Sequence, residues 1–225
     1  MPSYSGVFTL QAQMQAVAAT NWPVPPLQIG QAYAGGFYAG QISTAGNGIA
    51  DYNLVVGPVA SAQNTSVKWK NVNTATVGAD SAVDGTQNTA DIVADGNATV
   101  YPAGHFCNDL VIGGFSDWYM PAKNELEICY YNLKPSTASN NTSSGINANA
   151  VPARASNYTT GTPAQTSATD FQDTGAEDFL NTYWASTEGS ATQGWVQNFN
   201  VGGQYFSGFS KAYNYRVRAI RRVAV

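Results

Sequence analysis

GGFSDWYMPAKNELEICYYNL, residues 113–133, carries the strongest helix signal in the chain and decides its fold. Pro121 suits the first helical position, because a backbone N–H has no helical partner there. Lys134 and Pro135 are expected to end the helix. Apolar residues follow one helical face at i, i+3, i+4 and i+7: Leu126, Cys129, Tyr130 and Leu133. This pattern predicts a helix packed on a core, with the Cys129 thiol buried.

A shorter helix is expected upstream, within DSAVDGTQNTADIVADG, residues 80–96. Asn88 or Thr89 is expected to cap its first turn, because both side chains can accept a backbone N–H. Gly96 stands where a residue in the left-handed conformation commonly ends a helix.

Segments with β character surround these helices, because apolar and aromatic residues alternate with polar ones between glycine-rich turns. They are residues 32–43, 52–60, 66–72, 183–187, 194–201, 203–210 and 215–223. Residues 136–169 are almost wholly small and polar, which predicts a long irregular surface excursion. The fold class is therefore α+β, with two helices, a twisted antiparallel sheet and long irregular loops.

The first residues are expected to form a separate unit. Residues 9–20 have helical spacing, and the proline-rich residues 21–26 then interrupt any regular element. We predict an N-terminal docking and oligomerisation segment over residues 1–30 and a main domain over residues 31–225. A homotrimer is the expected assembly. MPSYSGVF lacks the basic and apolar regions of an export signal, so export by that route is not expected.

Composition excludes several classes of protein. Only 11% of the residues are charged, against a typical share of about a quarter, and the net charge is −4. Five Trp, 13 Tyr and nine Phe argue against a disordered chain. The acidic balance argues against nucleic-acid binding, and no apolar run reaches the roughly 18 residues of a membrane span.

The sequence offers little for catalysis, so we predict no enzyme activity, no cofactor and no metal. A single histidine, His105, would have to serve any catalytic triad, and it stands in HFCND without a nucleophile motif. His105 and Cys107 fall short of a metal site, and His105 is expected to be a capping or core residue.

Two further features leave alternatives open. Cys107 and Cys129 are expected to be buried reduced thiols, although a disulfide between them is the alternative. Asp80, Asp84 and Asp91 supply the oxygen ligands that calcium prefers, but their spacing matches no EF-hand loop.

Half of the basic residues lie near the end of the chain, where YRVRAIRRV places Arg216, Arg218 and Arg221 toward one side of a strand. These arginines are expected to pair with the acidic residues 170–179 or with a neighbouring subunit.

Three ordered blocks resemble a known family: residues 113–133, then YWASTEGSATQGWVQNFNVG, then YRVRAIRRV. They are similar to the C-type-lectin-like domain family of phage structural and receptor-binding proteins and bacterial adhesins, which includes the C-terminal domain of the legionella collagen-like adhesin. The resemblance covers about residues 80–223. The matching positions are Gly113, Gly114, Asp117, Trp118, Pro121, Glu125, Leu126, Trp184, Ser186, Thr187, Trp195, Phe199, Val217, Arg218 and Arg221.

The resemblance implies a C-type-lectin-like fold with Trp118, Trp184 and Trp195 at the centre of the core. Asp117 is expected to accept backbone hydrogen bonds at the helix entry. The Glu-Pro-Asn and Trp-Asn-Asp tripeptides of calcium-dependent animal lectins are absent from the sequence, so calcium-dependent sugar binding is not expected.

The resemblance also implies a function. We expect a virion or tail-fibre protein of a phage that attaches to a glycan or protein of the host surface. The alternatives are a structural head-decoration or cementing protein without a ligand and a bacterial surface adhesin. Other virion proteins would bind the N-terminal segment.

The ligand face is expected within residues 197–215, where scaffold positions alternate with aromatic and amide side chains. Tyrosine gives a large contact area at low entropy cost, and asparagine gives adaptable hydrogen bonds. Tyr205, Phe209 and Tyr213 could instead be inward-facing strand residues. The candidate ligand-binding residues are Asn198, Asn200, Gln204, Tyr205, Phe209, Tyr213 and Asn214.

Overall fold

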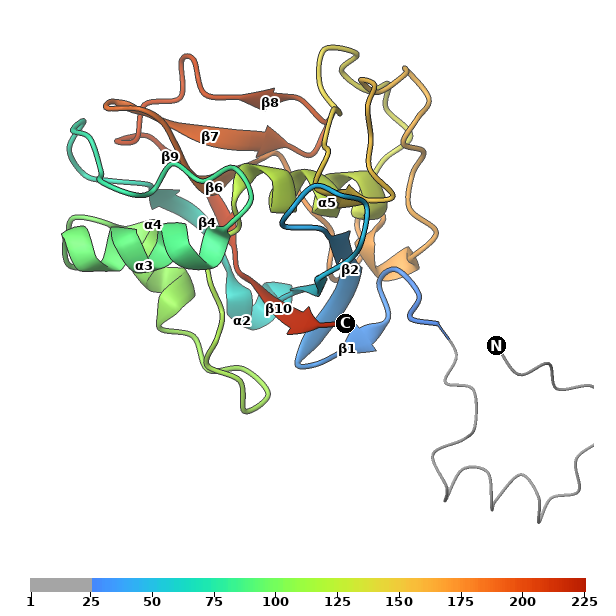
Figure 1. Ribbon diagram of the computed structural model, residues 1–225, viewed down its shortest axis with the longest axis horizontal. Helices are drawn as coiled ribbons and strands as arrows, with labels where there is room; N and C mark the ends of the chain where they lie inside the picture. The colour runs from blue at the N-terminus through green and yellow to red at the C-terminus, as the bar shows by residue number, and fades with distance from the viewer. Residues whose placement is uncertain (1–25) are drawn as a thin grey trace, which may run out of the picture.

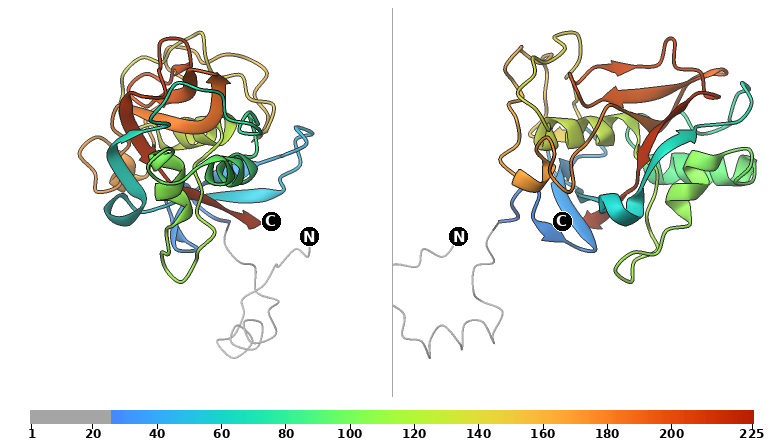
Figure 2. Two further views of the ribbon diagram at one scale, coloured as in Figure 1. Left: turned by 90° about the vertical axis from the view of Figure 1, so that its left-hand side faces the viewer. Right: turned by 180° about the vertical axis from the view of Figure 1, so that it is seen from behind.

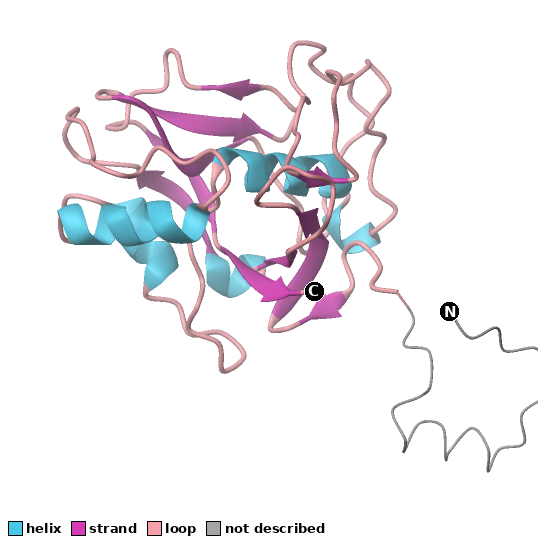
Figure 3. Ribbon diagram, viewed as in Figure 1, coloured by secondary structure: helices cyan, strands magenta, loops and turns pink. Residues whose placement is uncertain are grey.

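Two sheets and four helices build residues 26–225, the part of the chain that the computed structural model describes (Figures 1 and 3). The helices are α2 (Val59–Ala62), α3 (Gly85–Asp95), α4 (Pro102–Asn108) and α5 (Lys123–Leu133), with a 3₁₀ turn η1 (Thr169–Phe171). The predicted α+β class is confirmed. The expectation of two helices is wrong, because α4 and the single turn α2 were not predicted. None of the helices in this part of the chain is long and apolar enough to span a bilayer.

The first sheet has the order β1-β2-β3-β10, and β5 pairs with the end of β2 along the edge that β1 also occupies. Its strands are β1 (Ala32–Tyr33), β2 (Gly36–Ile42), β3 (Tyr52–Val56), β5 (Ala150–Val151) and β10 (Ile220–Ala224). The second sheet has the order β4-β9-β6-β7-β8. Its strands are β4 (Gln63–Lys68), β6 (Thr182–Ser190), β7 (Gln193–Asn198), β8 (Gln204–Tyr205) and β9 (Asn214–Arg218).

The sheet prediction needs two corrections. There are two sheets rather than one, and the consecutive strands β9 and β10 belong to different sheets. The strand pair β6–β9 is parallel rather than antiparallel, with Tyr183 opposite Arg216.

Helix α5 lies between the two sheets, against β2 on one side and β6 and β7 on the other (Figure 1). Helices α3 and α4 pack on each other and cover β6 and β4. The long irregular segment after α5 lies at the opposite end of the molecule from α3 and α4, as Figure 1 and the right-hand view of Figure 2 show. The structure therefore separates a helical end from a loop-rich end.

Two hydrophobic cores fill the molecule. One surrounds α5 and contains Cys129, and the other contains Cys107 and three tryptophans, Trp69, Trp118 and Trp184. Because the two cysteines lie in different cores as free thiols, the expectation of reduced cysteines is confirmed. Burial raises the pKa of both thiols.

The predicted tryptophan centre is only partly correct. Trp118 and Trp184 are buried together in the second core, but the third tryptophan of that core is Trp69. Trp195 is half-buried at the edge of the first core instead. The Trp69 indole N–H donates to the Ala185 carbonyl at 2.9 Å, which satisfies its polar edge inside the core.

Helix α3 begins earlier than predicted. Asp84, not Asn88 or Thr89, is the N-cap, and its carboxylate accepts the Gln87 backbone N–H at 3.2 Å. The Asn88 amide is buried and donates to the Ser81 carbonyl and the Ser186 hydroxyl. Gly96 is extended (φ −178°) rather than left-handed, so its predicted conformation is wrong.

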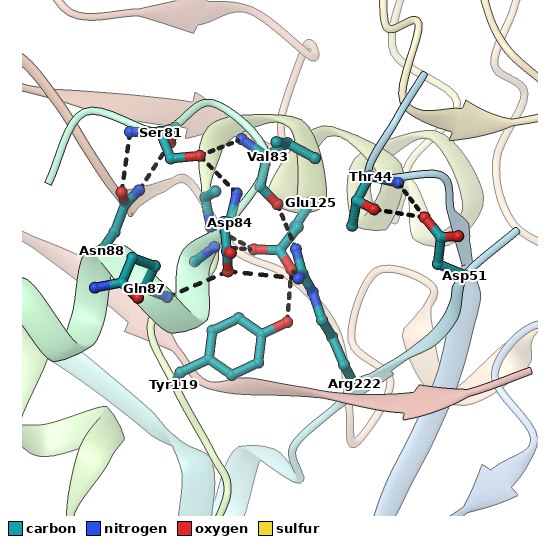
Figure 4. Close-up of polar contacts among 12 residues, drawn as sticks. Thr44, Asp51, Ser81, Val83, Asp84, Gln87, Asn88, Tyr119, Glu125 and Arg222 are labelled. Carbon is teal, nitrogen blue, oxygen red and sulfur yellow. Dashed lines mark hydrogen bonds and ion pairs between the residues drawn. The ribbon is translucent and has the colours of Figure 1, made fainter. Parts of the chain in front are cut away.

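Helix α5 begins at Lys123, two residues after Pro121, because a side-chain acceptor fixes the preceding residue. Glu125 Oε2 accepts the Ala122 backbone N–H at 2.7 Å and the Gly85 N–H, at the start of α3, at 3.1 Å. Its other oxygen accepts from the Tyr119 hydroxyl at 2.5 Å and from Arg222 Nε at 2.8 Å (Figure 4). We call these groups the Glu125 cluster.

The Glu125 carboxyl is fully buried. Burial raises its pKa, and the Arg222 guanidinium and the Tyr119 hydroxyl oppose that rise. Arg222 also donates to the Val83 carbonyl and lies 3.4 Å from Asp84, so one β10 side chain joins the starts of both helices (Figure 4).

Two of the other three C-terminal arginines, Arg218 and Arg221, also form internal ion pairs. Arg218 is buried against Glu177 and donates to the Gly57 carbonyl at 2.8 Å. This confirms the expected pairing with the acidic residues 170–179. Arg216 forms no ion pair among residues 26–225, so only part of the predicted set pairs as expected.

Asp117 has a different partner from the one predicted. It accepts two hydrogen bonds from Arg221, at 2.7 and 2.8 Å, instead of backbone N–H groups at the helix entry. The Arg221 guanidinium also lies 3.8 Å from the centre of the Phe115 ring. The first and last family blocks are therefore joined by one bidentate ion pair.

Most of the predicted N-terminal segment, including residues 9–20 and the proline-rich break, lies outside the described residues. At its end, Ile29 packs against the first core and the Gly30 N–H donates to the Tyr38 carbonyl at 2.8 Å.

We predict that Glu125→Ala lowers the free energy of unfolding by about 3–5 kcal/mol, because Arg222 and two backbone N–H groups would lose a buried partner. Urea denaturation followed by circular dichroism measures this loss. The exposed carboxylate of Asp80 makes no hydrogen bond within residues 26–225, so Asp80→Ala should stay within about 0.5 kcal/mol. Equal effects of the two variants would contradict the role of the cluster.

The Asp117–Arg221 pair should give a specific pH dependence. Hydrogen bonds from Arg221 lower the pKa of Asp117 below its ordinary value. The pair therefore stabilises the fold above about pH 4, the ordinary Asp pKa, and this contribution is lost as the pH falls through the lowered value. We expect Asp117→Asn to have a lower Tm than the parent at pH 6, with the difference shrinking below pH 4. A difference that is constant from pH 6 to pH 2.5 would contradict this.

Candidate functional site

Two adjoining hollows meet at the half-buried side chain of Trp195, on β7. The first, about 200 Å³, lies over β8 and the residues that follow it. The second, about 240 Å³, lies between the start of α5 and the loop after it. The first is lined by Trp195, Gln204, Tyr205, Phe206 and Ser207, and the second by Lys123, Ser143, Ser144, Gly145, Ile146, Asn157, Trp195 and Gln204. We call the pair the Trp195 hollow.

Aromatic and cationic groups surround the indole. The Phe206 ring centre lies 4.9 Å from the Trp195 ring centre, and Lys123 Nζ lies 4.2 Å from it. Partial burial lowers the pKa of the Lys123 ammonium. The ammonium–indole contact is a cation–π interaction, which holds Lys123 over the ring.

Gln204 ties three elements together at the hollow. Its side-chain amide donates to the Lys123 carbonyl at 2.7 Å, at the first residue of α5. Its backbone N–H donates to the Ser144 hydroxyl at 3.1 Å. Because β8 pairs with β7 through Gln204 and Gln197, these contacts fix the hollow to the second sheet.

A second buried carboxylate shapes the loop beside the hollow. Glu127 accepts the Asn147 side-chain amide at 2.5 Å, the Tyr158 hydroxyl and the Arg154 guanidinium. Burial raises the pKa of Glu127, and Arg154 opposes that rise. Residues 143–158 have little regular structure, yet these contacts hold them against α5.

The predicted ligand residues separate into three places. Gln204 and Tyr205 line the Trp195 hollow. Asn198 and Asn200 form the turn after β7, where Asn198 Oδ1 accepts the Asn200 N–H at 2.8 Å. Asn214 lines a separate polar hollow of about 250 Å³, together with Thr65, Asn181, Thr182, Tyr215 and Arg216.

The aromatic candidates differ in exposure. For each of them, exposure decides between a ligand-facing residue and an inward-facing strand residue. Tyr205 and Phe209 are half-buried, stack on each other at 6.0 Å and pack against the second core. Tyr213 is 57% exposed and does not face inward. The inward-facing alternative therefore describes Phe209 and much of Tyr205, but not Tyr213.

Sequence reasoning missed Trp195, Lys123 and Phe206 as site residues. The sequence predicts a core position for Trp195, since nothing in its local pattern distinguishes it from Trp184. Its open edge depends on residues 143–157, which are distant in sequence.

The other chemical candidates have structural roles. His105 Nε2 lies 2.7 Å from the Gly96 carbonyl, as expected for a capping residue. Asp84 caps α3, Asp91 accepts from the Gln87 amide at 2.9 Å, and Asp80 is exposed. Within residues 26–225, no three His, Cys, Asp or Glu side chains gather as metal ligands.

The fold and the Trp195 hollow define an α+β domain with a partly exposed aromatic site at its loop-rich end. Residues 59–221, more than two thirds of the chain, match the Lcl C-terminal domain family, and the chain belongs to this adhesin-like family. The resemblance to the C-terminal domain of the legionella collagen-like adhesin is thereby confirmed, and the match begins about 20 residues earlier than expected. No curated protein matches the chain.

We predict opposite outcomes for two tyrosine substitutions. Tyr205→Ala should lower the free energy of unfolding by about 1–3 kcal/mol, because it removes the stacking on Phe209 and a hydrogen bond from Asn141. Tyr213→Ala should change it by no more than about 0.5 kcal/mol, since its side chain is mostly in solvent. Urea denaturation of both variants measures the difference, and a Tyr213 loss as large as that of Tyr205 would contradict the assignment.

Proposed function

We propose that the protein is a non-enzymatic attachment protein whose Trp195 hollow binds a glycan of a host surface. The observation that carries this proposal is the half-buried Trp195, with an accessible edge beside neutral amide and hydroxyl side chains. The apolar C–H face of a sugar ring packs on an indole, and its hydroxyls bond to amides such as those of Gln204 and Asn157. A host protein is the other ligand that the site would accept.

Membership of an adhesin-like family supports this proposal. We also propose that the fold is C-type-lectin-like, which agrees with a central helix between two twisted sheets and a long loop-rich segment beside the site.

The proposed setting is a phage virion or tail fibre. Residues 1–30 would dock on other virion proteins or on sister subunits, and the assembly would be a homotrimer. The low charge of the chain supports close packing of copies, since few charges would need to be desolvated. A head-decoration protein without a ligand and a bacterial surface adhesin are the alternatives. No nucleic acid, membrane, cofactor or metal is part of the proposal.

Attachment of the labelled full chain to a panel of bacterial strains tests the function, with Trp195→Ala as the variant. We expect this variant to attach at least tenfold less than the parent. We also expect the parent to lose attachment when the glycans of the cells have been oxidised with periodate. Arg216→Ala, in the separate polar hollow, is the matched control and should attach like the parent.

Circular dichroism and Tm confirm that each variant is folded. Undiminished attachment by folded Trp195→Ala would contradict the site. Absence of attachment by the parent chain to every strain and to animal cells would favour the decoration protein.

A further inference from the structure

Two more hollows continue from the Trp195 hollow along the loop-rich end. The third, about 270 Å³, is lined by Tyr131, Arg154, Ala155, Ser156, Asn157, Tyr158, Thr159 and Thr162. The fourth, about 330 Å³, is lined by Ile29, Tyr131, Asn132, Gly161, Thr162, Pro163, Ala164, Gln165, Thr166 and Ser167.

Neighbouring hollows share lining residues. Asn157 lines both the second and the third, and Tyr131 and Thr162 line both the third and the fourth. Since Trp195 and Gln204 already join the first two, the four form one row from β8 to Ile29. We call this row the loop-end groove.

We infer that the loop-end groove holds an internal stretch of an uncharged polysaccharide chain, with several sugar units bound at once. This inference rests on the proposed function and names the class of its ligand.

The size of the hollows supports an extended ligand. Pockets that bury a whole small molecule usually measure about 300–1,000 Å³, and three of the four hollows are smaller than that range. A single sugar in one hollow would keep much of its surface in water. A chain that occupies adjacent hollows adds contacts along the row, and the second and later units bind at high effective concentration.

The lining repeats one kind of chemistry along the row. Aromatic rings stand at two places along the row, with Trp195 and Phe206 near β8 and Tyr131 between the third and fourth hollows. Neutral amides and hydroxyls lie between and beyond these rings, from Gln204, Ser144, Asn157, Thr162 and Gln165. Such side chains suit a polymer of hydroxyl-rich rings, and a peptide would instead need an open row of backbone N–H and C=O groups.

Charge favours a neutral polymer. Arg154 is the only arginine along the groove, and its charge is matched by the buried Glu127 while its guanidinium lies 4.1 Å from the Tyr131 ring centre. Lys123 is then the one basic side chain of the lining without a carboxylate partner within residues 26–225. A polyanion would meet one compensating ammonium along four hollows, so the groove does not match it.

The test uses surface polysaccharide purified from cells to which the parent chain attaches, cut by mild acid and separated by length. Fragments of each length compete with these cells for the labelled full chain. We expect long fragments to inhibit at concentrations at least tenfold lower than mono- or disaccharides. Attachment should change less than threefold between 50 and 500 mM NaCl.

Asn157→Trp is the diagnostic variant, because this exposed residue lies where the second and third hollows join and its side chain makes no hydrogen bond within residues 26–225. The larger side chain should block the passage between the two hollows, so that long fragments lose their advantage and inhibit at about the concentration that short ones need. Asn157→Ala controls for loss of the amide, and Arg216→Ala controls for a change outside the groove.

Three results would overturn the inference alone while leaving attachment established. They are equal potency of short and long fragments, an unchanged length dependence in Asn157→Trp, and at least a tenfold loss of attachment at high salt. Attachment that survives periodate but is lost after protease treatment of the cells would identify a protein ligand and also overturn it. Absence of any attachment would overturn the proposed function first.

Discussion

The buried Glu125 carboxylate is the interaction on which the rest of the structure depends. An ionised carboxylate in a protein interior is tolerated only when donors replace the water it has lost. Those donors come from α3 through Gly85, from the start of α5 through Ala122, and from β10 through Arg222 (Figure 4). The start of α3, the start of α5 and strand β10 must therefore pack against one another in the folded protein, because each supplies a donor to this carboxylate. Half a turn along the same helix, Glu127 acts in the same way on the loop that contains Arg154 and Tyr158, so α5 organises both the scaffold and the candidate site.

Local periodicity explains which parts of the fold could be predicted. The apolar face of α5 and the alternation in the β segments are properties of neighbouring residues, and the predicted elements lie close to the observed ones. Helix α4 could not be predicted from the sequence, because PAGHFCN is short and contains Gly104. The Cα of Gly104 faces Ile92 so closely that a methyl group would not fit. The parallel pairing of β6 with β9 depends on the path of residues 191–213, which no local pattern records.

The candidate site was predictable only where it coincides with a strand. Gln204 and Tyr205 follow from the aromatic and amide pattern of their segment, and the structure places both in the Trp195 hollow. Lys123 and Asn157 come from a helix start and from an irregular loop, and they reach Trp195 only through long-range contacts. The small and polar composition of residues 143–158 predicts that they are exposed. Their fixed course depends on Asn147 and the other partners of the buried Glu127 carboxylate, which the composition does not reveal.

The division of β9 and β10 between the two sheets has a consequence for biosynthesis. Strand β9 lies between β4 and β6 in the second sheet, and β10 supplies both the outer partner of β3 and the guanidinium of Arg222. Neither sheet is complete until residues 214–224 have left the ribosome. Because chains are made at about 5–20 residues per second, the edges of β3 and β4 that pair with these residues stay open for several seconds or more during synthesis. Neither sheet can therefore form in full before residues 214–224 are made, and until then the unpaired edges of β3 and β4 are open to association with other chains.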